Sequence, residues 1–265
     1  MYQAPKTLRQ SHALLAAALL FASFVSPLRA DDRMAEPTQA PATNELHYLR
    51  AGKPDAVALL APPPLPASVE QAADMAETVA VHAQCPPADA ATAKSEKKFF
   101  VFAFTPAIGS FFQPGKLPKT EAFLKRVQDD TESVEDTAKN FWKRPRPYTV
   151  NPALARGADD LEKSFSYPSG HSTRGTVFAL VLADLFPDKR DAILAVGRDI
   201  GWRRVEIARH YPTDIYAGRV LARAIVGEMK TSRKFQKDFA KAQKEIASLL
   251  AEEKPAPEPA TAAVH

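Results

Sequence analysis

Hydrophobic and polar positions along the chain follow the spacing of helices rather than of strands. Apolar residues return every three to four positions within long stretches that lack proline, and strict alternation of apolar and polar residues is nowhere sustained. Proline costs about 3 kcal/mol inside a helix, so windows without it are natural places for helices. Six such windows predict the helical segments: 67–85, 88–105, 119–144, 169–186, 188–211 and 213–254.

Three of these windows carry further signals. Ser68 followed by Gln71 has the spacing of a capping box, which predicts where the first helix begins. Thr176–Phe186 is apolar on nearly every face, which predicts a buried central helix. The last window is expected to hold two helices that separate near Thr231–Ser232. Its second half has apolar residues at steps of three to four: Phe235, Phe239, Ala242, Ile246 and Leu249. The pattern as a whole predicts an all-α fold, a compact multi-helix bundle in a single domain.

The first thirty residues have the layout of a secretory signal peptide. Basic residues without acidic ones come first, then the apolar run Ala13–Val25, then Ala30 directly before Asp31. An uncleaved membrane anchor is the alternative, but this run is shorter than the about 20 residues that a spanning helix needs. We therefore expect residues 1–30 to be removed on export, which predicts a periplasmic protein.

Proline content divides the rest of the chain. Residues 31–66 are rich in proline and predict an extended lead-in that lies over the surface. Residues 67–253 form the predicted helical domain. Residues 254–265 combine proline, alanine and glutamate, which predicts a disordered tail.

Charge and cysteine usage exclude several classes of protein. The 265 residues carry a formal net charge of +4, and residues 1–30 contain three of the basic residues and no acidic one. The remaining chain is therefore nearly neutral, which argues against a nucleic-acid partner. No apolar run after the first thirty residues approaches 18, so integral membrane association is not expected. The one cysteine, Cys85, excludes an internal disulfide and is expected to be a buried small residue.

The first candidate cluster is a basic one, Lys139 to Pro147. Lys139 should lie in the last turns of a helix that Pro145 stops, and Arg146 stands between two prolines that stiffen its backbone. Two cations on a rigid frame can clamp a phosphate, with forked donors from arginine and a point charge from lysine. The alternative is a solvated basic helix end.

The second cluster, Pro168 to His171, directly precedes the predicted central helix. A helix start offers unpaired N–H groups and a positive dipole end that suit an oxyanion. Ser169 can add a hydroxyl, Gly170 lets the backbone approach closely, and His171 would stand at the edge of the pocket. The alternative is an ordinary N-cap followed by an exposed histidine.

The third cluster contains Arg204, His210 and Asp214. His210 is expected to end the fifth helix, with Pro212 starting the next one. Asp214 can accept one imidazole N–H of His210, fix its tautomer and leave the other nitrogen as a nucleophile. Arg204 would reach the same end of the bundle. The alternative is a local His–Asp pair that only caps the helix.

Together, the three clusters fit phosphoryl transfer through a phosphohistidine. They also resemble the phosphatidic-acid-phosphatase type 2 superfamily, most of all the bacterial class A nonspecific acid phosphatases. The family pattern is Lys-x6-Arg-Pro, then Pro-Ser-Gly-His, then Ser-Arg-x5-His-x3-Asp. The chain matches it at Lys139, Arg146, Pro147, Pro168, Ser169, Gly170, His171, Arg204, His210 and Asp214.

The resemblance implies a role for each matched residue. His210 would be the nucleophile, Asp214 the residue that orients it, and His171 the general acid for the leaving alkoxide. The phosphoryl oxygens would be held by Lys139, Arg146, Ser169, Gly170 and Arg204. It also implies an all-α phosphoric monoester hydrolase that acts on small-molecule phosphate monoesters without a metal or other cofactor.

Two positions depart from the family. Arg203 replaces the usual serine and is expected to disturb the hydrogen bonds of Arg204 or add a cation near the pocket. Ala208-Arg209 stands where many relatives have a small residue or a Cys-Gly pair, and Arg209 is expected to crowd or recharge the pocket mouth. Two alternatives stay open: a vanadium haloperoxidase-like enzyme, which would hold vanadate in much the same pocket, and a helical protein that binds phosphate without turnover, whose degenerate site Arg203 and Arg209 would mark.

Overall fold

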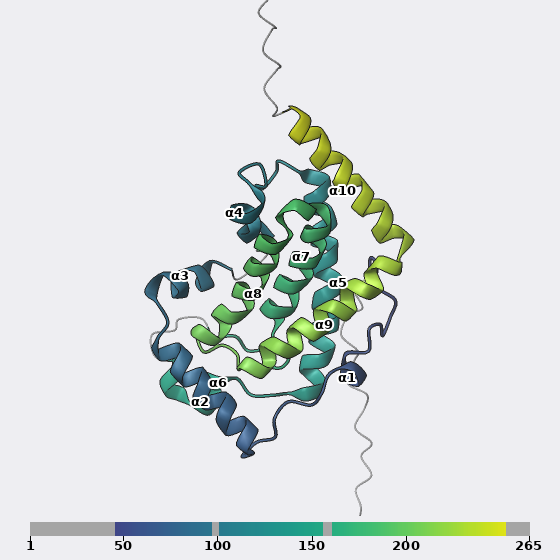
Figure 1. Cartoon of the computed structure of the whole chain (residues 1–265). Coiled ribbons are helices and arrows are strands. Elements are labelled where there is room, and N and C mark those ends of the chain that lie inside the picture. The colour runs from purple at the N-terminus through teal and green to yellow at the C-terminus, as the bar shows by residue number, and fades with distance from the viewer. Residues whose placement is uncertain (1–45, 97–100, 156–160, 253–265) are drawn as a thin grey trace, which may run out of the picture. The chain divides into compact units, whose positions relative to one another are not determined.

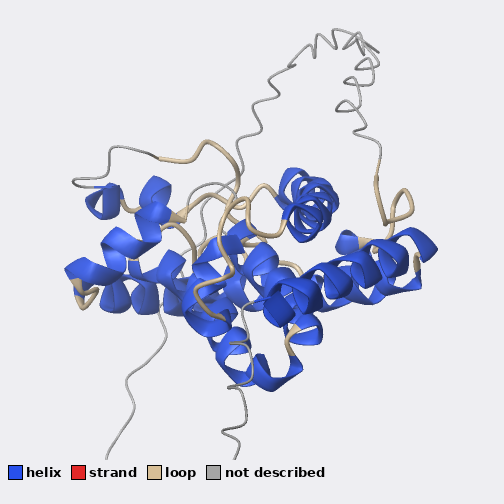
Figure 2. Cartoon of the chain, turned by 90° about the horizontal axis from the view of Figure 1, so that it is seen from above, coloured by secondary structure: helices blue, strands red, loops and turns tan. Residues whose placement is uncertain are grey.

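Helices make up all the regular structure of the described residues, which are 46–96, 101–155 and 161–252 of a computed structural model (Figures 1 and 2). The α-helices are α1 (Ala56–Leu59), α2 (Val69–Ala83), α3 (Pro87–Ser95), α4 (Thr105–Ile108), α5 (Pro118–Trp142), α6 (Pro147–Val150), α7 (Gly170–Leu185), α8 (Arg190–Glu206), α9 (Pro212–Thr231) and α10 (Arg233–Glu252). Short 3-10 helices occur at η1 (Val101–Phe104), η2 (Pro152–Ala155) and η3 (Pro187–Lys189). The predicted all-α fold is confirmed.

Proline marks most helix boundaries as the sequence predicts. Pro118 and Pro212 stand in the first turn of α5 and α9, where the missing N–H costs nothing. The predicted break in the last window lies at Ser232, between α9 and α10. The window 88–105 is wrong as a single helix, because α3 ends at Ser95 and α4 begins only at Thr105. Absence of proline permits a helix but does not extend one.

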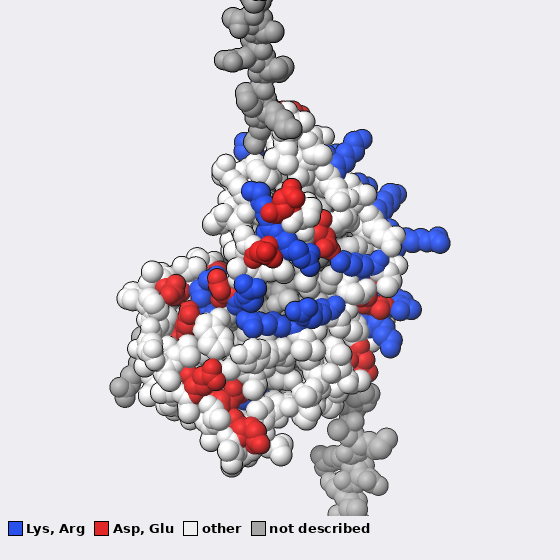
Figure 3. Space-filling model, viewed as in Figure 1, with Lys and Arg blue, Asp and Glu red and all other residues white. Residues whose placement is uncertain are grey.

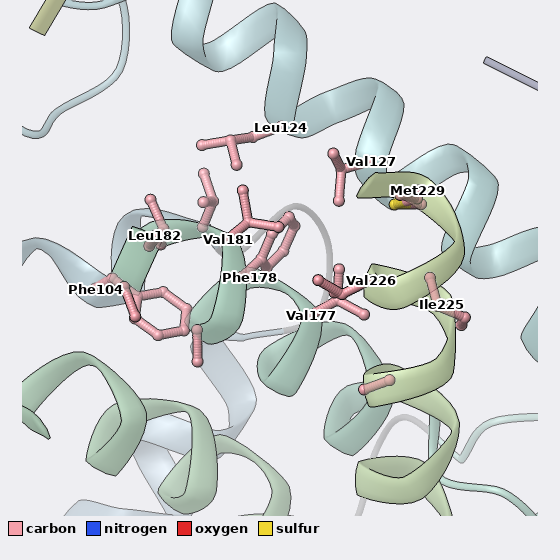
Figure 4. Packing of buried hydrophobic residues seen from close by; sticks show 14 of the residues in the cluster. Phe104, Leu124, Val127, Val177, Phe178, Val181, Leu182, Ile225, Val226 and Met229 are labelled. Carbon is pink, nitrogen blue, oxygen red and sulfur yellow. The ribbon is translucent and has the colours of Figure 1, made fainter. Parts of the chain in front are cut away.

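Helix α7 lies at the centre of the bundle, as its apolar sequence predicts. It packs most extensively against α8, α9 and α5. Figure 4 shows this core, with Leu124 and Val127 from α5, Val177, Phe178, Val181 and Leu182 from α7, and Ile225, Val226 and Met229 from α9. Each such side chain stabilises the fold by about 1.5–3 kcal/mol when fully buried, so this core fixes the position of α7 and of its N-terminus.

Glycine allows α7 and α8 to approach closely. A Cβ on Gly197 would lie 2.6 Å from Cβ of Ala179 and 2.9 Å from the carbonyl oxygen of Gly175. No side chain fits at that distance, so the crossing of the two helices depends on this position. The crossing in turn sets where the chain after α8 emerges.

Helix α10 packs its apolar stripe on the chain's own core. Phe235, Ala242 and Ile246 are buried, and the ring of Phe235 lies 5.2 Å from that of Phe123 in α5. Its basic side chains project along the edge of the molecule that α10 forms (Figure 3). None of the described helices has both the length and the apolar character needed to cross a membrane.

The ends of the chain are described only in part. The predicted signal peptide, residues 1–30, and the predicted tail, residues 254–265, lie outside the described residues. Of the proline-rich lead-in, the part from residue 46 contains α1. Beyond α1, the hydroxyl of Tyr167 donates a hydrogen bond of 2.5 Å to the carbonyl oxygen of Ala61.

Candidate active site

Five chain segments that are distant in sequence converge on one cavity of about 750 Å³. They are the end of α2, then α3, the second half of α5 with the chain after it, the start of α7, and the end of α8 with the turn after it. The predicted site residues that line the cavity are Lys139, Arg146, Gly170, His171, Arg204 and His210. Ser169 and Asp214 lie directly behind this wall, fully buried. All eight predicted residues therefore come together.

His210 stands in a turn between α8 and α9 rather than at the end of a helix. Helix α8 stops at Glu206, Ala208 takes a left-handed φ of 52°, and the His210 N–H donates to the carbonyl oxygen of Arg204 at 3.1 Å. Proline at 212 disfavours a helical conformation for Tyr211, which is extended. The expectation that His210 ends the fifth helix is thus wrong by four residues, and the turn aims its ring into the cavity.

Asp214 fixes the tautomer of His210. Nδ1 of His210 lies 3.2 Å from Oδ2 of Asp214. A carboxylate only accepts, so Nδ1 carries the proton and Nε2 keeps a lone pair. Burial and the nearby charge of Arg146 lower the pKa of His210 to about 3. The imidazole is therefore neutral even in acid solution.

Asp214 itself is held by groups that the sequence did not single out. Arg144 donates to its Oδ1 at 2.6 Å, and the hydroxyl of Ser166 donates to its Oδ2 at 2.6 Å. Burial alone would raise the pKa of Asp214, but the hydrogen bond from His210 and the charge of Arg144 hold it well below its usual range. Arg144 also donates to Asp74 of α2 at 2.6 Å. It lies inside the basic cluster, and only the fold reveals that it faces carboxylates.

Lys139 and Arg146 point inward rather than into solvent. Nζ of Lys139 donates to the carbonyl oxygen of Pro168 at 2.6 Å, at the approach to α7. Arg146 donates to the carbonyl oxygen of Ser164 at 2.7 Å, and its Nη1 lies 3.2 Å from Nε2 of His210. Burial and the charge of Arg146 lower the pKa of Lys139 to about 8. Both cations are buried, so the alternative of a solvated helix end is wrong.

The start of α7 contributes Ser169 and His171 to the site. Ser169 is the N-cap, and its hydroxyl accepts the N–H of Ser172 at 3.3 Å. His171 is buried, with Nε2 2.7 Å from the carbonyl oxygen of Glu96, so the alternative of an exposed histidine is wrong. Since a carbonyl only accepts, Nε2 is the donor and Nδ1 is left as the nitrogen that can gain a proton. Burial and the charge of Arg204 lower the pKa of His171.

Glu96 is a further residue that sequence reasoning missed. It is buried, its Oε2 accepts from Nη2 of Arg204 at 2.8 Å, and its Oε1 accepts from Arg203. Arg203, the departure from the family pattern, thus has a carboxylate partner. Nothing in the sequence near Glu96 marks it, because only the fold brings this residue, which directly follows α3, against Arg204 and His171.

Arg209, the second departure, is also paired. Its Nε lies 3.4 Å from Oε2 of Glu162, and its guanidinium lies 5.3 Å from the centre of the Tyr148 ring. Glu162 also lies 3.5 Å from Nη1 of Arg146. Arg209 therefore lines the cavity without being an isolated positive charge there.

Two further observations concern the chemistry of the site. Within the described ranges, no three or more His, Cys, Asp or Glu side chains are grouped so that they could hold a metal ion. Cys85 is partly exposed, so the expectation of a buried cysteine is wrong. It lies at the end of α2, where the chain turns at the surface.

Comparison with known proteins identifies the same part of the chain. Residues 131–237 match the model of the PAP2 superfamily. The chain is 33% identical over 151 residues to the non-specific acid phosphatase of Providencia stuartii, an alignment that covers 56% of this chain and 61% of the relative. It is 32% identical over 147 residues to the non-specific acid phosphatase of Salmonella typhimurium, covering 54% and 59%. The resemblance that the motifs indicate is thereby confirmed.

The coverage of these matches is limited. The aligned part of the chain spans about three fifths of the length of the curated relatives. Among solved structures, the chain resembles a transmembrane PAP2 type phosphatidylglycerolphosphate phosphatase from Bacillus subtilis, with a TM-score of 0.46 and 21% identity. That superposition covers 66% of this chain and 89% of the other.

Proposed function

From the PAP2 match of residues 131–237 and the geometry around His210, we propose that this chain is an exported acid phosphatase. It hydrolyses small-molecule phosphate monoesters through a phosphohistidine. The observation that carries this proposal is the buried pair of His210 and Asp214, which leaves the Nε2 lone pair of His210 directed at a cavity lined by cations. Binding alone would need the cations but not this histidine.

In the first step, the phosphoryl group is held by Lys139, Arg146 and Arg204 together with the start of α7. These cations neutralise the monoester so that a neutral imidazole can attack. Arg146, which now donates toward Nε2 of His210, turns its donor to a phosphoryl oxygen and frees the lone pair. A bond forms between Nε2 and phosphorus while the bond from phosphorus to the ester oxygen breaks.

His171 supplies the proton to the departing alkoxide. Its Nε2–H stays with the carbonyl oxygen of Glu96, so the mobile proton is the one on Nδ1. In the free protein, burial and the charge of Arg204 disfavour this proton, and a bound phosphoryl anion offsets them with its negative charge. Substrate binding therefore favours protonation of His171 at Nδ1, which makes it a general acid. In the second step, a water gives a proton to Nδ1 of His171 while its oxygen bonds to phosphorus and the bond from phosphorus to Nε2 of His210 breaks, which releases phosphate and restores both histidines.

The low pKa of His210 fits work in acid solution. A surface histidine would be largely protonated at pH 5 and unable to attack. A pKa of about 3 keeps His210 neutral there. We expect a bell-shaped pH dependence of the rate with its optimum on the acid side, whose limbs belong to the coupled site rather than to one residue each.

The test is hydrolysis of an aryl phosphate monoester, with excess chelator and separately with vanadate. Turnover should survive the chelator and be inhibited by vanadate, which mimics the phosphoryl group in transfer. His210→Ala should abolish turnover and the trapped phosphoenzyme, whereas His47→Ala, a partly exposed histidine outside the cavity, should change neither. Phosphate binding without turnover would refute the proposal, and so would halide oxidation by peroxide in the vanadate-loaded protein with little hydrolysis beforehand.

Export is tested separately. N-terminal sequencing of the mature protein from the periplasm should begin at Asp31. A mature chain that still carries residues 1–30 would contradict this part of the proposal.

A further inference from the structure

A buried carboxyl group with an unbonded oxygen faces the cavity beside the start of α7. Glu135 lies on α5, one turn before Lys139, so both side chains project from the same face of the helix. It is 2% exposed and lines the cavity. Its Oε1 has no hydrogen-bond partner, which is costly for a buried polar atom and therefore asks for an explanation.

The carboxyl group of Glu135 occupies the space beside Gly170. A Cβ at position 170 would lie 2.8 Å from Oε2 of Glu135. Gly170 is the first residue of α7, where the phosphoryl group of the proposed function is held. The absence of a side chain at this glycine is therefore what lets Glu135 reach the oxyanion position.

We propose that Glu135 is a further phosphoryl-binding residue, which donates a hydrogen bond from its protonated carboxyl group to a phosphoryl oxygen at the start of α7. This inference rests on the proposed function. Ionisation of Glu135 replaces the donor with a negative charge, which expels the anion. The residue thereby makes anion binding depend on acid conditions.

The surroundings of Glu135 favour the protonated form. From α5 it faces Glu132, Asp136 and Lys139, and from α7 it faces Arg174, whose Nε lies 3.9 Å from Oε1. Burial, reinforced by Glu132 and Asp136 and opposed by the two cations, raises the pKa of Glu135 to about 8. The carboxyl group is a hydrogen-bond donor below that pH.

The experiment measures binding of inorganic sulfate by calorimetry between pH 6 and pH 9. Sulfate keeps its charge over this range and is not turned over. Glu135 and Lys139 both have a pKa of about 8, so between pH 6 and pH 9 the wild type should lose the positive charge of Lys139 and gain a negative charge on Glu135. Its Kd should rise about a hundredfold from pH 6 to pH 9, at about tenfold per group one unit above its pKa.

Two variants separate the carboxyl proton from the rest of the pocket. Glu135→Gln keeps a donor and cannot ionise, so its Kd should rise only about tenfold. Glu135→Met removes the donor as well and should bind sulfate about tenfold more weakly than Glu135→Gln at pH 6. Glu121→Gln, the same side-chain change on α5 but outside the cavity, should keep the hundredfold wild-type rise.

The outcomes are decisive in both directions. A hundredfold rise in Glu135→Gln, equal binding by the Gln and Met variants at pH 6, or no sulfate binding by the wild type would each overturn the inference. A wild type that binds sulfate with the expected pH profile but hydrolyses no monoester would refute the proposed function and leave the assignment of Glu135 standing.

Discussion

Two buried carboxyl groups flank the same cavity, and their protonation is displaced in opposite directions. Asp214, on the His210 side, accepts hydrogen bonds from Arg144, Ser166 and the N–H of Tyr211, and its pKa is held well below the usual range. Glu135, on the α5 side, has an unbonded Oε1 and a pKa raised to about 8. Burial raises the pKa of both groups, so the difference comes from their partners.

This contrast indicates two different roles for a buried carboxyl group. A carboxylate that is fully hydrogen-bonded has a fixed charge and can hold an imidazole in one tautomer at every working pH. A carboxyl group with few partners keeps its proton and can release it within an accessible pH range. Asp214, on the His210 side of the cavity, therefore orients His210, whereas Glu135, on the α5 side, responds to pH.

The largest effect is expected from Asp214→Asn. The carboxamide can present its NH₂ to Nδ1 of His210, which would move the proton to Nε2 and remove the nucleophilic lone pair. The rate of monoester hydrolysis should fall about 10³–10⁴-fold, as for loss of the orienting carboxylate in other histidine-based sites. Thermal unfolding of the variant shows whether the fold is retained. A fall of less than tenfold in a folded variant would mean that Asp214 does not set the tautomer.

The next effect concerns the two arginines that face these carboxyl groups. Arg144→Met leaves Asp74 and Asp214 buried without their cation and should lower the free energy of unfolding by about 3–5 kcal/mol. Arg174→Met should cost only about 1 kcal/mol, because Glu135 can stay protonated and Glu132 is partly exposed. Urea denaturation at pH 6 measures both. Equal losses would contradict the difference between the two sides of the cavity.

How far the sequence predicts this arrangement depends on whether a residue acts locally. His210 and Asp214 are four residues apart in one turn, so spacing alone predicts their contact, and the same holds for the N-cap Ser169. Arg144 and Glu96 act across separations of 70 and 108 residues, which no local pattern reveals.

The predicted capping box illustrates the same limit. The hydroxyl of Ser68 accepts the N–H of Gln71 as predicted. The side chain of Gln71, however, accepts a hydrogen bond from Arg144 at 2.7 Å. The local pattern assigns the Gln71 side chain to the helix start, but in the folded chain this side chain binds Arg144, which is distant in sequence. That contact depends on tertiary packing.

A smaller effect is expected in the pH dependence of stability. The pKa of Glu135 is higher in the folded state, at about 8, than its ordinary value of 4.5, so its contribution is fully present below pH 4.5 and is lost as the pH rises toward 8. Glu135→Gln should remove this loss, flattening the change in unfolding free energy between pH 5 and pH 8 by about 3–4 kcal/mol. Urea denaturation of both proteins at a series of pH values measures it. A variant that loses stability as steeply as the wild type would show that Glu135 is already ionised at pH 5.

The smallest effect is expected from Glu96→Gln. Glu96 holds Arg204 with a carboxylate oxygen at 2.8 Å, so a phosphoryl group must compete with it for the same guanidinium. In Glu96→Gln a neutral carboxamide oxygen replaces the carboxylate as the acceptor from Arg204, which weakens this hydrogen bond by about 1 kcal/mol. The inhibition constant of inorganic phosphate should therefore fall about three- to tenfold. The maximal rate should change little, because His171 is held by the backbone carbonyl of Glu96 and not by its side chain.

Glu162→Gln is the matched control, since this more exposed carboxylate lies 3.5 Å from Arg146 and should change the constant less than twofold. Weaker phosphate binding in Glu96→Gln would mean that Glu96 positions Arg204 for the substrate, as Asp214 positions His210, rather than competing with the substrate for it.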